Sequence, residues 1–327
     1  MKLLIGTRGS HLARTQATGV AGKLAELGHD TDLKIIRTAG DRSTATSFGS
    51  IGPQGVFVRE IEQALLAGEV DIAIHSYKDL PTQSPDELTI GAVPARLDPA
   101  DVLVMTREAA GAPGEALGIA NGARVGTASA RRQAWIRHLR PDITVMPIRG
   151  NVPTRINRLR TDLDGVVLAS AGLQRLRRST LDGVADPVKD EFVVHRLPPR
   201  GFVPAPAQGA LAIQCRRADD GICELLAPLD HAATRQAVAA ERDLLARVEG
   251  GCDLAFGAWC ATVESGANQI ADAASSNNTL RTSSPGAVRL IAWLEHEGVL
   301  HKADSQSANP DALVNSAWAE LERQWTG

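Results

Sequence analysis

Arginine is concentrated in one segment of this chain, where lysine is absent. Between Arg124 and Arg178 there are 12 arginines and three acidic residues, which gives +9, whereas the whole chain of 327 residues carries −3. The planar guanidinium of arginine favours forked contacts to carboxylate or phosphate groups. The segment therefore predicts binding of an anion, and the small overall charge argues against a global field for nucleic acid or membrane.

The best candidates for anion contacts follow runs that are predicted to be strands. Open α/β sheets bind ligands beyond the carboxyl ends of their strands, and helix N-termini add unpaired N–H donors there. We expect Arg8, Arg131, Arg132, Arg149 and Arg155 to contact one large anionic ligand, because they stand next to Gly, Ser or Thr at strand ends. The same strand ends carry Ser10, Lys78, Thr127, Ser129, Gly150 and Arg175. Solvated helix faces are expected instead for Arg137, Arg140, Arg158, Arg160, Arg177 and Arg178.

Asp79 is a lone carboxylate at one of these strand ends. It could be a turn residue before Pro81 or an ion-pair partner of Lys78. It could equally be catalytic, because a fixed carboxylate stabilises a cation that forms during a reaction and holds an N–H group. The sequence leaves these alternatives open. His75, just before it, is predicted to be a hydrogen-bonded core residue.

Cys252 lies in the stretch VEGGCDLAFGAW, directly after two glycines. Such a pair leaves room for a bulky group to approach, although a free cysteine is also often a small buried hydrophobe. The other cysteines are Cys215, Cys223 and Cys260; no two are spaced C-x-x-C, so no structural zinc site is expected. With no signal-peptide pattern and no run of 18 apolar residues, we expect a cytoplasmic protein with reduced thiols.

The elements that must position these residues alternate between strands and helices. Apolar runs at 2–6, 32–37, 71–76 and 88–93 predict strands, and helical spacing is found at 11–27 and 55–67. A second series of the same kind begins near residue 100, which indicates α/β domains with mainly parallel sheets. After Asp219 a long helix at 231–248, strands and a final helix predict a smaller α+β domain, interrupted by a polar stretch at 264–286.

Several of these stretches resemble one known family. GTRGSHLARTQA, GVFVREIEQALLAGEVDIAIHSYKDLPT, GTASARRQ, IRGNVPTRINRL, ASAGLQRL, PAPAQGALAIQC and VEGGCDLAFGAW are similar, in this order from residue 5 to about 260, to the porphobilinogen deaminases, also called hydroxymethylbilane synthases. The joint occurrence of HSxKD, GNxxTR and the Gly-Gly-Cys loop makes the resemblance specific.

The resemblance implies a fold, a reaction and a cofactor. The fold would comprise two lobes like those of type 2 periplasmic binding proteins, at 1–97 with 196–217 and at 98–195, and a smaller C-terminal α+β domain at 218–327. The reaction joins four porphobilinogens head to tail, releases ammonia each time and gives 1-hydroxymethylbilane for haem biosynthesis. It is primed on a dipyrromethane cofactor, which would be attached by a thioether to Cys252.

Roles for individual residues follow from the same resemblance. Asp79 would hold pyrrole N–H groups, assist the departure of ammonia and stabilise the cationic azafulvene. The strand-end cations and hydroxyls named above, together with Ser76 and Gly150, would hold the acetate and propionate groups. The protein is expected to be a monomer with porphobilinogen as its small-molecule substrate, without nucleic acid, membrane or metal.

Some positions depart from the family pattern. The segment TSFGSIGPQGVF corresponds to a mobile lid, but Gln54 stands where a lysine is common. Ala255 and Phe256 follow Cys252 where a proline is common, and the stretch 264–286 is expected to be an insertion without a catalytic role. Two rival functions are a non-catalytic anion-binding protein of the same two-lobed fold and an arginine-rich nucleic-acid binder. The second is weakened because Trp135 is the one aromatic residue in the basic segment.

Overall fold

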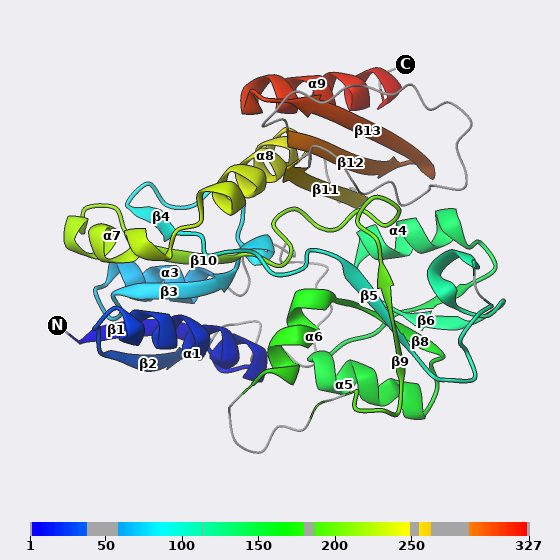
Figure 1. The fold of residues 1–327 in the computed structure, drawn as a ribbon, viewed down its shortest axis with the longest axis horizontal. Helices are drawn as coiled ribbons and strands as arrows, with labels where there is room; N and C mark the ends of the chain where they lie inside the picture. Colours follow the sequence, from blue (N-terminus) through cyan, green and yellow to red (C-terminus); the bar gives the residue numbers. More distant parts are fainter. Residues whose placement is uncertain are drawn as a thin grey trace.

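The computed structural model describes residues 2–37, 58–112, 114–179, 186, 188–248, 255–262 and 288–325. Cys252, Gln54 with the predicted lid, and the stretch 264–286 lie outside these residues. The described chain forms three sheets with helices packed on them, arranged as two lobes and a third unit (Figure 1). Among the described residues, no helix is long and apolar enough to cross a membrane.

The first lobe contains a five-stranded sheet with the order β2-β1-β3-β10-β4. Its strands are β1 (Leu3–Arg8), β2 (Thr31–Ile36), β3 (Ile72–Ser76), β4 (Leu88–Ala92) and β10 (Leu211–Arg216). Its helices are α1 (His11–Glu26), α3 (Arg59–Leu66) and α7 (Asp220–Leu226). Helix α1 begins as predicted, because the Ser10 side chain accepts a hydrogen bond from the amide of Ala13 at 3.3 Å.

The second lobe contains a five-stranded sheet with the order β7-β6-β8-β5-β9. Its strands are β5 (Asp101–Met105), β6 (Arg124–Gly126), β7 (Thr144–Met146), β8 (Gly165–Ala169) and β9 (Val193–Leu197). Its helices are α4 (Ala130–Leu139), α5 (Val152–Asn157) and α6 (Ser170–Arg177). Each helix follows a strand, so its N-terminus lies at the carboxyl end of that strand.

The chain passes between the lobes twice, from β4 to β5 and from β9 to β10. In each sheet the strand that arrives from the other lobe runs against its neighbours: β5 is antiparallel to β8 and β9, and β10 is antiparallel to β3 and β4. The sheets are therefore mixed, although the remaining strands of each share one direction. These two connections, 93–100 and 198–210, are called the crossovers below.

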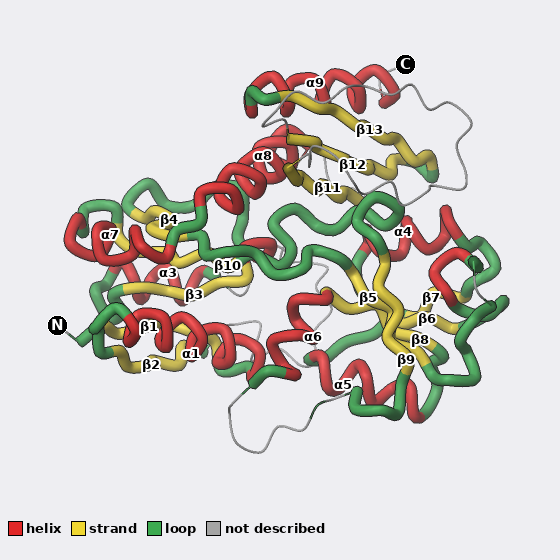
Figure 2. Tube along the Cα trace, viewed as in Figure 1, coloured by secondary structure: helices red, strands yellow, loops and turns green. Residues whose placement is uncertain are grey.

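The third unit is an antiparallel sheet of β11 (Ala255–Thr262), β12 (Val288–His296) and β13 (Val299–Ser307), with α8 (Ala232–Val248) and α9 (Pro310–Trp325) packed on it (Figure 2). The predicted fold class, two α/β units followed by a smaller α+β unit, is confirmed. Sequence reasoning did not predict α7 and β13.

A buried ion pair attaches the third unit to both crossovers. Glu241 on α8 is fully buried and accepts two hydrogen bonds from Arg96 of the first crossover, at 2.6 and 3.0 Å. It also accepts from the amides of Ala207 in the second crossover (2.7 Å) and Cys260 on β11 (2.8 Å). One carboxylate therefore joins four segments that are far apart in sequence.

Candidate active site

The two lobes contact each other through helices that begin at their strand ends. Helix α1 contacts α6, and the hydroxyls of Thr15 and Ser179 lie 3.2 Å apart across this contact. Gln16 on α1 donates to the hydroxyl of Ser76 at the end of β3 (2.9 Å). The predicted residues Ser10 and Ser76 therefore both have structural partners on α1, and these bonds fix α1 relative to β3.

Lys78 and Asp79 lie in a short 3-10 turn, Tyr77–Asp79, directly after β3. The turn is closed by the backbone, because the amide of Leu80 donates to the carbonyl of Tyr77. Arg242 of α8 stacks on the Tyr77 ring at 4.6 Å and donates to the carbonyl of Leu80. Within the described residues, the side chain of Asp79 makes no hydrogen bond that supports this turn, and it is exposed.

Burial lowers the pKa of Lys78 to about 8, and the nearby carboxylate of Asp79 is the largest influence that opposes this. His75 is buried as predicted, and burial lowers its pKa to about 4, so the ring is neutral at physiological pH. The turn therefore presents one cation and one exposed carboxylate side by side.

Arg131 and Arg132 share a buried partner that sequence reasoning missed. Asp101, the first residue of β5, accepts from Arg131 at 2.8 Å and twice from Arg132, at 3.1 and 2.7 Å. Burial alone would raise the pKa of Asp101, but the two guanidinium groups hold it well below its usual range. Arg131 also donates to the carbonyl of Val203, and Arg132 to that of Val167. Both arginines are thus fixed in place before any ligand binds.

Gln208 of the second crossover joins this cluster to the turn after β3. Its amide nitrogen donates to Asp101 at 2.9 Å, and its oxygen accepts from the Nζ atom of Lys78 at 3.3 Å. Lys78 from the first lobe and the arginine pair from the second are therefore brought together at the crossovers. A signal for the two missed residues was present: Asp101 is a charged residue opening a strongly apolar strand, and Gln208 is a polar residue in the run PAPAQGA.

The hydroxyl residues before α4 serve its N-terminus. The Ser129 side chain accepts from the amide of Arg132 at 3.4 Å, and the Thr127 hydroxyl accepts from the amide of Ser129 at 3.2 Å. Thr127 is buried, while Ser129 is partly exposed. These bonds hold the start of α4, and so aim the two arginines that follow.

The loop after β7 carries Arg149, Gly150 and Arg155. Gly150 has φ +101°, and an added Cβ atom would lie 2.8 Å from the Thr154 side chain, so glycine is required there. Its carbonyl accepts from Nε of Arg155 at 2.8 Å. The pKa of Arg155 is lowered by burial and by the like charge of Arg132, which places these two arginines near each other. Arg149 itself is exposed at the loop.

Arg175 on α6 points to the second crossover, where it donates to the carbonyl of Gly209 at 2.8 Å. Burial lowers its pKa to about 10. Arg8 lies half-buried at the end of β1. Including Lys78, seven predicted cations occupy these strand ends, and in the part of the chain that the structure describes Asp79 and Asp101 are the acidic residues among them. The donor set suits a ligand with several carboxylates, because the excess positive charge requires anions to offset it.

One of the remaining arginines, Arg140, is not solvated, contrary to the prediction, whereas Arg137, Arg160, Arg177 and Arg178 are exposed as predicted. Arg140 is buried and bonds to Asp142 and to the carbonyls of Ala116 and Ile119. Ion pairs also hold three further arginines: Arg158 with Asp162, Arg160 with Glu191 and Arg177 with Asp186. The expectation is therefore wrong for Arg140 and incomplete for these three, because nearby acids and carbonyls satisfy them.

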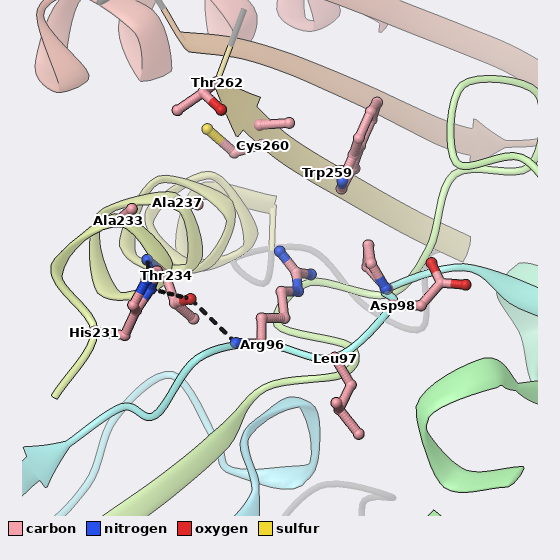
Figure 3. Close-up of a pocket in the computed structure, with 12 residues that line it drawn as sticks. Arg96, Leu97, Asp98, His231, Ala233, Thr234, Ala237, Trp259, Cys260 and Thr262 are labelled. Carbon is pink, nitrogen blue, oxygen red and sulfur yellow. Dashed lines mark hydrogen bonds between the residues drawn. The ribbon is translucent and has the colours of Figure 1, made fainter. Parts of the chain in front are cut away.

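A separate pocket of about 290 Å³ lies where the first crossover meets α8 and β11 (Figure 3). Arg96, Thr234 and Trp259 are among its lining residues, and the Thr234 hydroxyl accepts from the amide of Arg96 at 3.2 Å. None of the described residues that line it is a predicted site residue. The pocket thus belongs to the attachment of the third unit and is distinct from the strand-end cluster.

Comparison with known proteins identifies the family. Residues 3–224 match the family model described as porphobilinogen deaminase, dipyromethane cofactor binding domain. The chain belongs to the porphobilinogen deaminase family. The porphobilinogen deaminase of Mycobacterium leprae (strain TN) is 47% identical over 262 residues, covering 80% of this chain and 78% of the relative. That of Mycobacterium tuberculosis (strain ATCC 25618 / H37Rv) is 46% identical over 263 residues, covering 80% and 79%.

Two of the solved structures that match are more distant in sequence than these two deaminases. An ancestral cationic amino acid solute-binding protein covers 70% of this chain and 87% of its own, with a TM-score of 0.40 and 13% identity. The periplasmic VFT2 domain of Bordetella pertussis BvgS covers 69% and 84%, with a TM-score of 0.37 and 14% identity. The porphobilinogen deaminase match, by contrast, spans both lobes and agrees with the cationic donor set, which fits a cofactor carrying carboxylates.

Proposed function

We propose that this chain is a hydroxymethylbilane synthase, a transferase that joins four porphobilinogen molecules head to tail and releases an ammonia at each step. The observation that carries the proposal is the cluster of cations from both lobes beside the exposed carboxylate of Asp79, in a chain of the porphobilinogen deaminase family. Each porphobilinogen brings an acetate and a propionate group, so the substrate and the growing product both match this positive charge. A non-catalytic anion-binding protein would have no use for the carboxylate.

Asp79 is the proposed catalytic residue. A carboxylate exposed at a strand end accepts hydrogen bonds from pyrrole N–H groups and stabilises the positive charge that develops on the substrate as ammonia leaves. The arginines around Asp79 oppose formation of a cation on the substrate, and the negative charge of Asp79 offsets this effect. Lys78 beside it is proposed to hold a substrate carboxylate.

The remaining cations are proposed to hold the other carboxylates. Arg131, Arg132 and Arg155 lie together in the second lobe, and Arg175 bonds to the crossover next to Gln208. Arg8, Ser10, Ser76, Thr127, Ser129, Arg149 and Gly150 complete the proposed binding set. The dipyrromethane cofactor, when bound, supplies the pyrrole end to which the first substrate is joined.

Cys252 is the proposed attachment point of the cofactor, through a thioether bond. It follows α8 and precedes β11, and Glu241 fixes both of these elements to the crossovers. The proposed domains are 1–97 with 196–217, 98–195 and 218–327. Two elements depart from these bounds: β9 extends the second lobe's sheet to Leu197, and α7 packs on the first lobe although it lies within 218–327. A cytoplasmic monomer without nucleic-acid or membrane partners stays a prediction.

The experiment is intact mass spectrometry of purified protein with an assay of porphobilinogen consumption. The active protein should exceed its sequence mass by two pyrrole units. Cys252→Ser should fold, carry no pyrroles and lose almost all activity, because a hydroxyl is a much weaker nucleophile than a thiolate. Cys223→Ser is the matched control and should keep both the added mass and the activity. A bare sequence mass in an active sample would reject the cofactor assignment.

A further inference from the structure

Asp101 accepts four hydrogen bonds near the proposed site, and no step of the proposed reaction uses it. The side chain is fully buried, and its two oxygens receive hydrogen bonds from Arg131, Arg132 and Gln208 at 2.7 to 3.1 Å. Such a carboxylate has no room for a substrate. Its influence on the reaction must therefore pass through the groups that it holds.

Gln208 can take only one orientation in this arrangement. It is fully buried, and its Nε2 atom donates to Asp101 at 2.9 Å and to the carbonyl of Pro99 at 2.8 Å. An amide nitrogen carries two hydrogens, and both are used by these acceptors. A flipped amide would set its oxygen against two acceptors and its N–H groups against an ammonium group. The Oε1 atom is therefore directed to Lys78, which donates to it at 3.3 Å.

The charge on Lys78 depends on a balance within the same cluster. Burial lowers its pKa to about 8; Asp79 and Asp101 oppose this, while Arg132 and Arg131 reinforce it. Among the described residues, these four are the charged groups that shift the pKa of Lys78: Asp79 lies in the turn itself, Arg131 and Arg132 in α4, and Asp101 in β5. Without the charge of Asp101, two arginines would be left with no buried acid to offset them, and Lys78 would lose its proton at lower pH.

The same contacts span both crossovers. Asp101 follows the first crossover directly, and Gln208 lies in the second one just before β10. The two residues connect the Lys78 turn of the first lobe to the Arg131–Arg132 pair of the second. A shift of one lobe against the other would therefore disturb this chain of hydrogen bonds.

We propose that Asp101 and Gln208 are positioning residues, which hold the ammonium group of Lys78 beside Asp79 and couple it to the Arg131–Arg132 pair across the crossovers. This inference rests on the proposed function for its catalytic consequence, but the coupling itself is independent of turnover. Neither residue touches the substrate. Both act by fixing where the Lys78 charge lies and over which pH range it persists.

The test measures the protonation of Lys78 directly in the full-length holoenzyme. Trace acetylation with acetic anhydride between pH 6.5 and 10.5, followed by peptide mass spectrometry, gives the midpoint at which Lys78 becomes reactive, with the exposed Lys23 as internal reference. In Asp101→Asn and in Gln208→Leu the midpoint should fall by at least about half a pH unit relative to the unmodified chain. Asp142→Asn is the matched control, because Asp142 pairs with Arg140 in the same lobe. In this variant the midpoint of Lys78 should stay where it is in the unmodified chain.

A kinetic readout separates positioning from simple stability. In Asp101→Asn the alkaline limb of the kcat/KM profile should move to lower pH, and KM for porphobilinogen should rise by a larger factor than kcat falls. Intact mass shows whether the variant still carries its pyrroles. Should Asp101→Asn fail to fold, Gln208→Leu, which removes no charge, answers the same question.

An unchanged Lys78 midpoint in folded variants, with only a lowered melting temperature, would overturn the proposal. Failure of the proposed function gives a different result: the unmodified chain would consume no porphobilinogen and carry no pyrroles. The labelling midpoints would still decide whether Asp101 and Gln208 control Lys78.

Discussion

At the scale of single residues, the question is whether Asp79 acts in the reaction or only in the turn. A backbone hydrogen bond closes that turn, and Arg242 packs on it from α8. Within the described residues, the Asp79 side chain therefore does not stabilise the turn. Its carboxylate is exposed beside a cation whose pKa is already lowered to about 8. These features argue against a role in the turn, and the variants below separate catalysis from ion pairing with Lys78.

The prediction at this scale concerns Asp79→Asn, which keeps the shape and removes the charge. Single-turnover rates should fall by about 10²–10³, the loss typical of one preorganised electrostatic group. Asp79→Glu keeps the charge and should retain part of the activity. Asp86→Asn, an exposed carboxylate of the same lobe, is the control and should leave the rate unchanged. A near-normal rate with a reduced melting temperature in Asp79→Asn would reject the catalytic assignment.

At the scale of elements, Glu241 determines how the third unit is attached. Its carboxylate holds the guanidinium of Arg96, the amide of Ala207 and the amide of Cys260 in one buried cluster. Loss of one partner of a buried ion pair leaves the other charge uncompensated, and this costs more than the pair itself contributes. The strand that follows Cys252 would then lose its fixed place against the crossovers.

Glu241→Gln should therefore lower the free energy of unfolding by about 3–5 kcal/mol, measured by urea denaturation. Glu224→Gln, an exposed residue of α7, is the matched control and should stay within about 0.5 kcal/mol of the unmodified chain. A loss below about 1 kcal/mol in Glu241→Gln would show that the cluster reorganises around the amide without leaving Arg96 unpaired.

At the scale of the whole molecule, the two lobes bring like charges together. The charge of Lys78 in the first lobe is felt by Arg131 and Arg132 of the second, and that of Arg132 by Arg155, and this mutual repulsion opposes the folded arrangement until a ligand with carboxylates offsets it. Salt weakens repulsion between partly exposed charges. The form without cofactor should therefore depend on salt more strongly than the holoenzyme.

The test compares the melting temperatures of Cys252→Ser and of the holoenzyme at 20 and at 300 mM sodium chloride. The screening length falls from roughly 20 Å at the lower concentration to roughly 8 Å or less at the higher one. The variant should gain about 2–4 °C more than the holoenzyme, which corresponds to about 1 kcal/mol for a domain of this size. Cys223→Ser, which keeps the cofactor, should follow the holoenzyme. Equal salt dependence in all three proteins would contradict the idea that the cation cluster is strained without its ligand.

The sequence by itself was sufficient for the family, for the order of most elements and for the positions of the candidate cations, because these depend on local patterns. Apolar runs mark β1, β3 and β8, and Ser10 caps α1 through the amide of a residue three positions away. Each family motif likewise lies in one unbroken stretch of sequence. By contrast, β13 turns His301, Ala303 and Ser305 inward, so no apolar alternation marks it. Helix α7 has seven residues, too few for a clear helical period.

Only the tertiary structure decided which charges meet. Asp101 lies 30 residues before Arg131 and 107 before Gln208, and Glu241 lies 145 residues after Arg96. No spacing rule links such positions, because the chain crosses between the lobes twice and returns with a reversed strand each time. The same crossings bring Lys78 of one lobe to the arginines of the other. The residues that could bind an anion were thus evident from the sequence, whereas the buried acids that hold them in place emerged only from the way the lobes join.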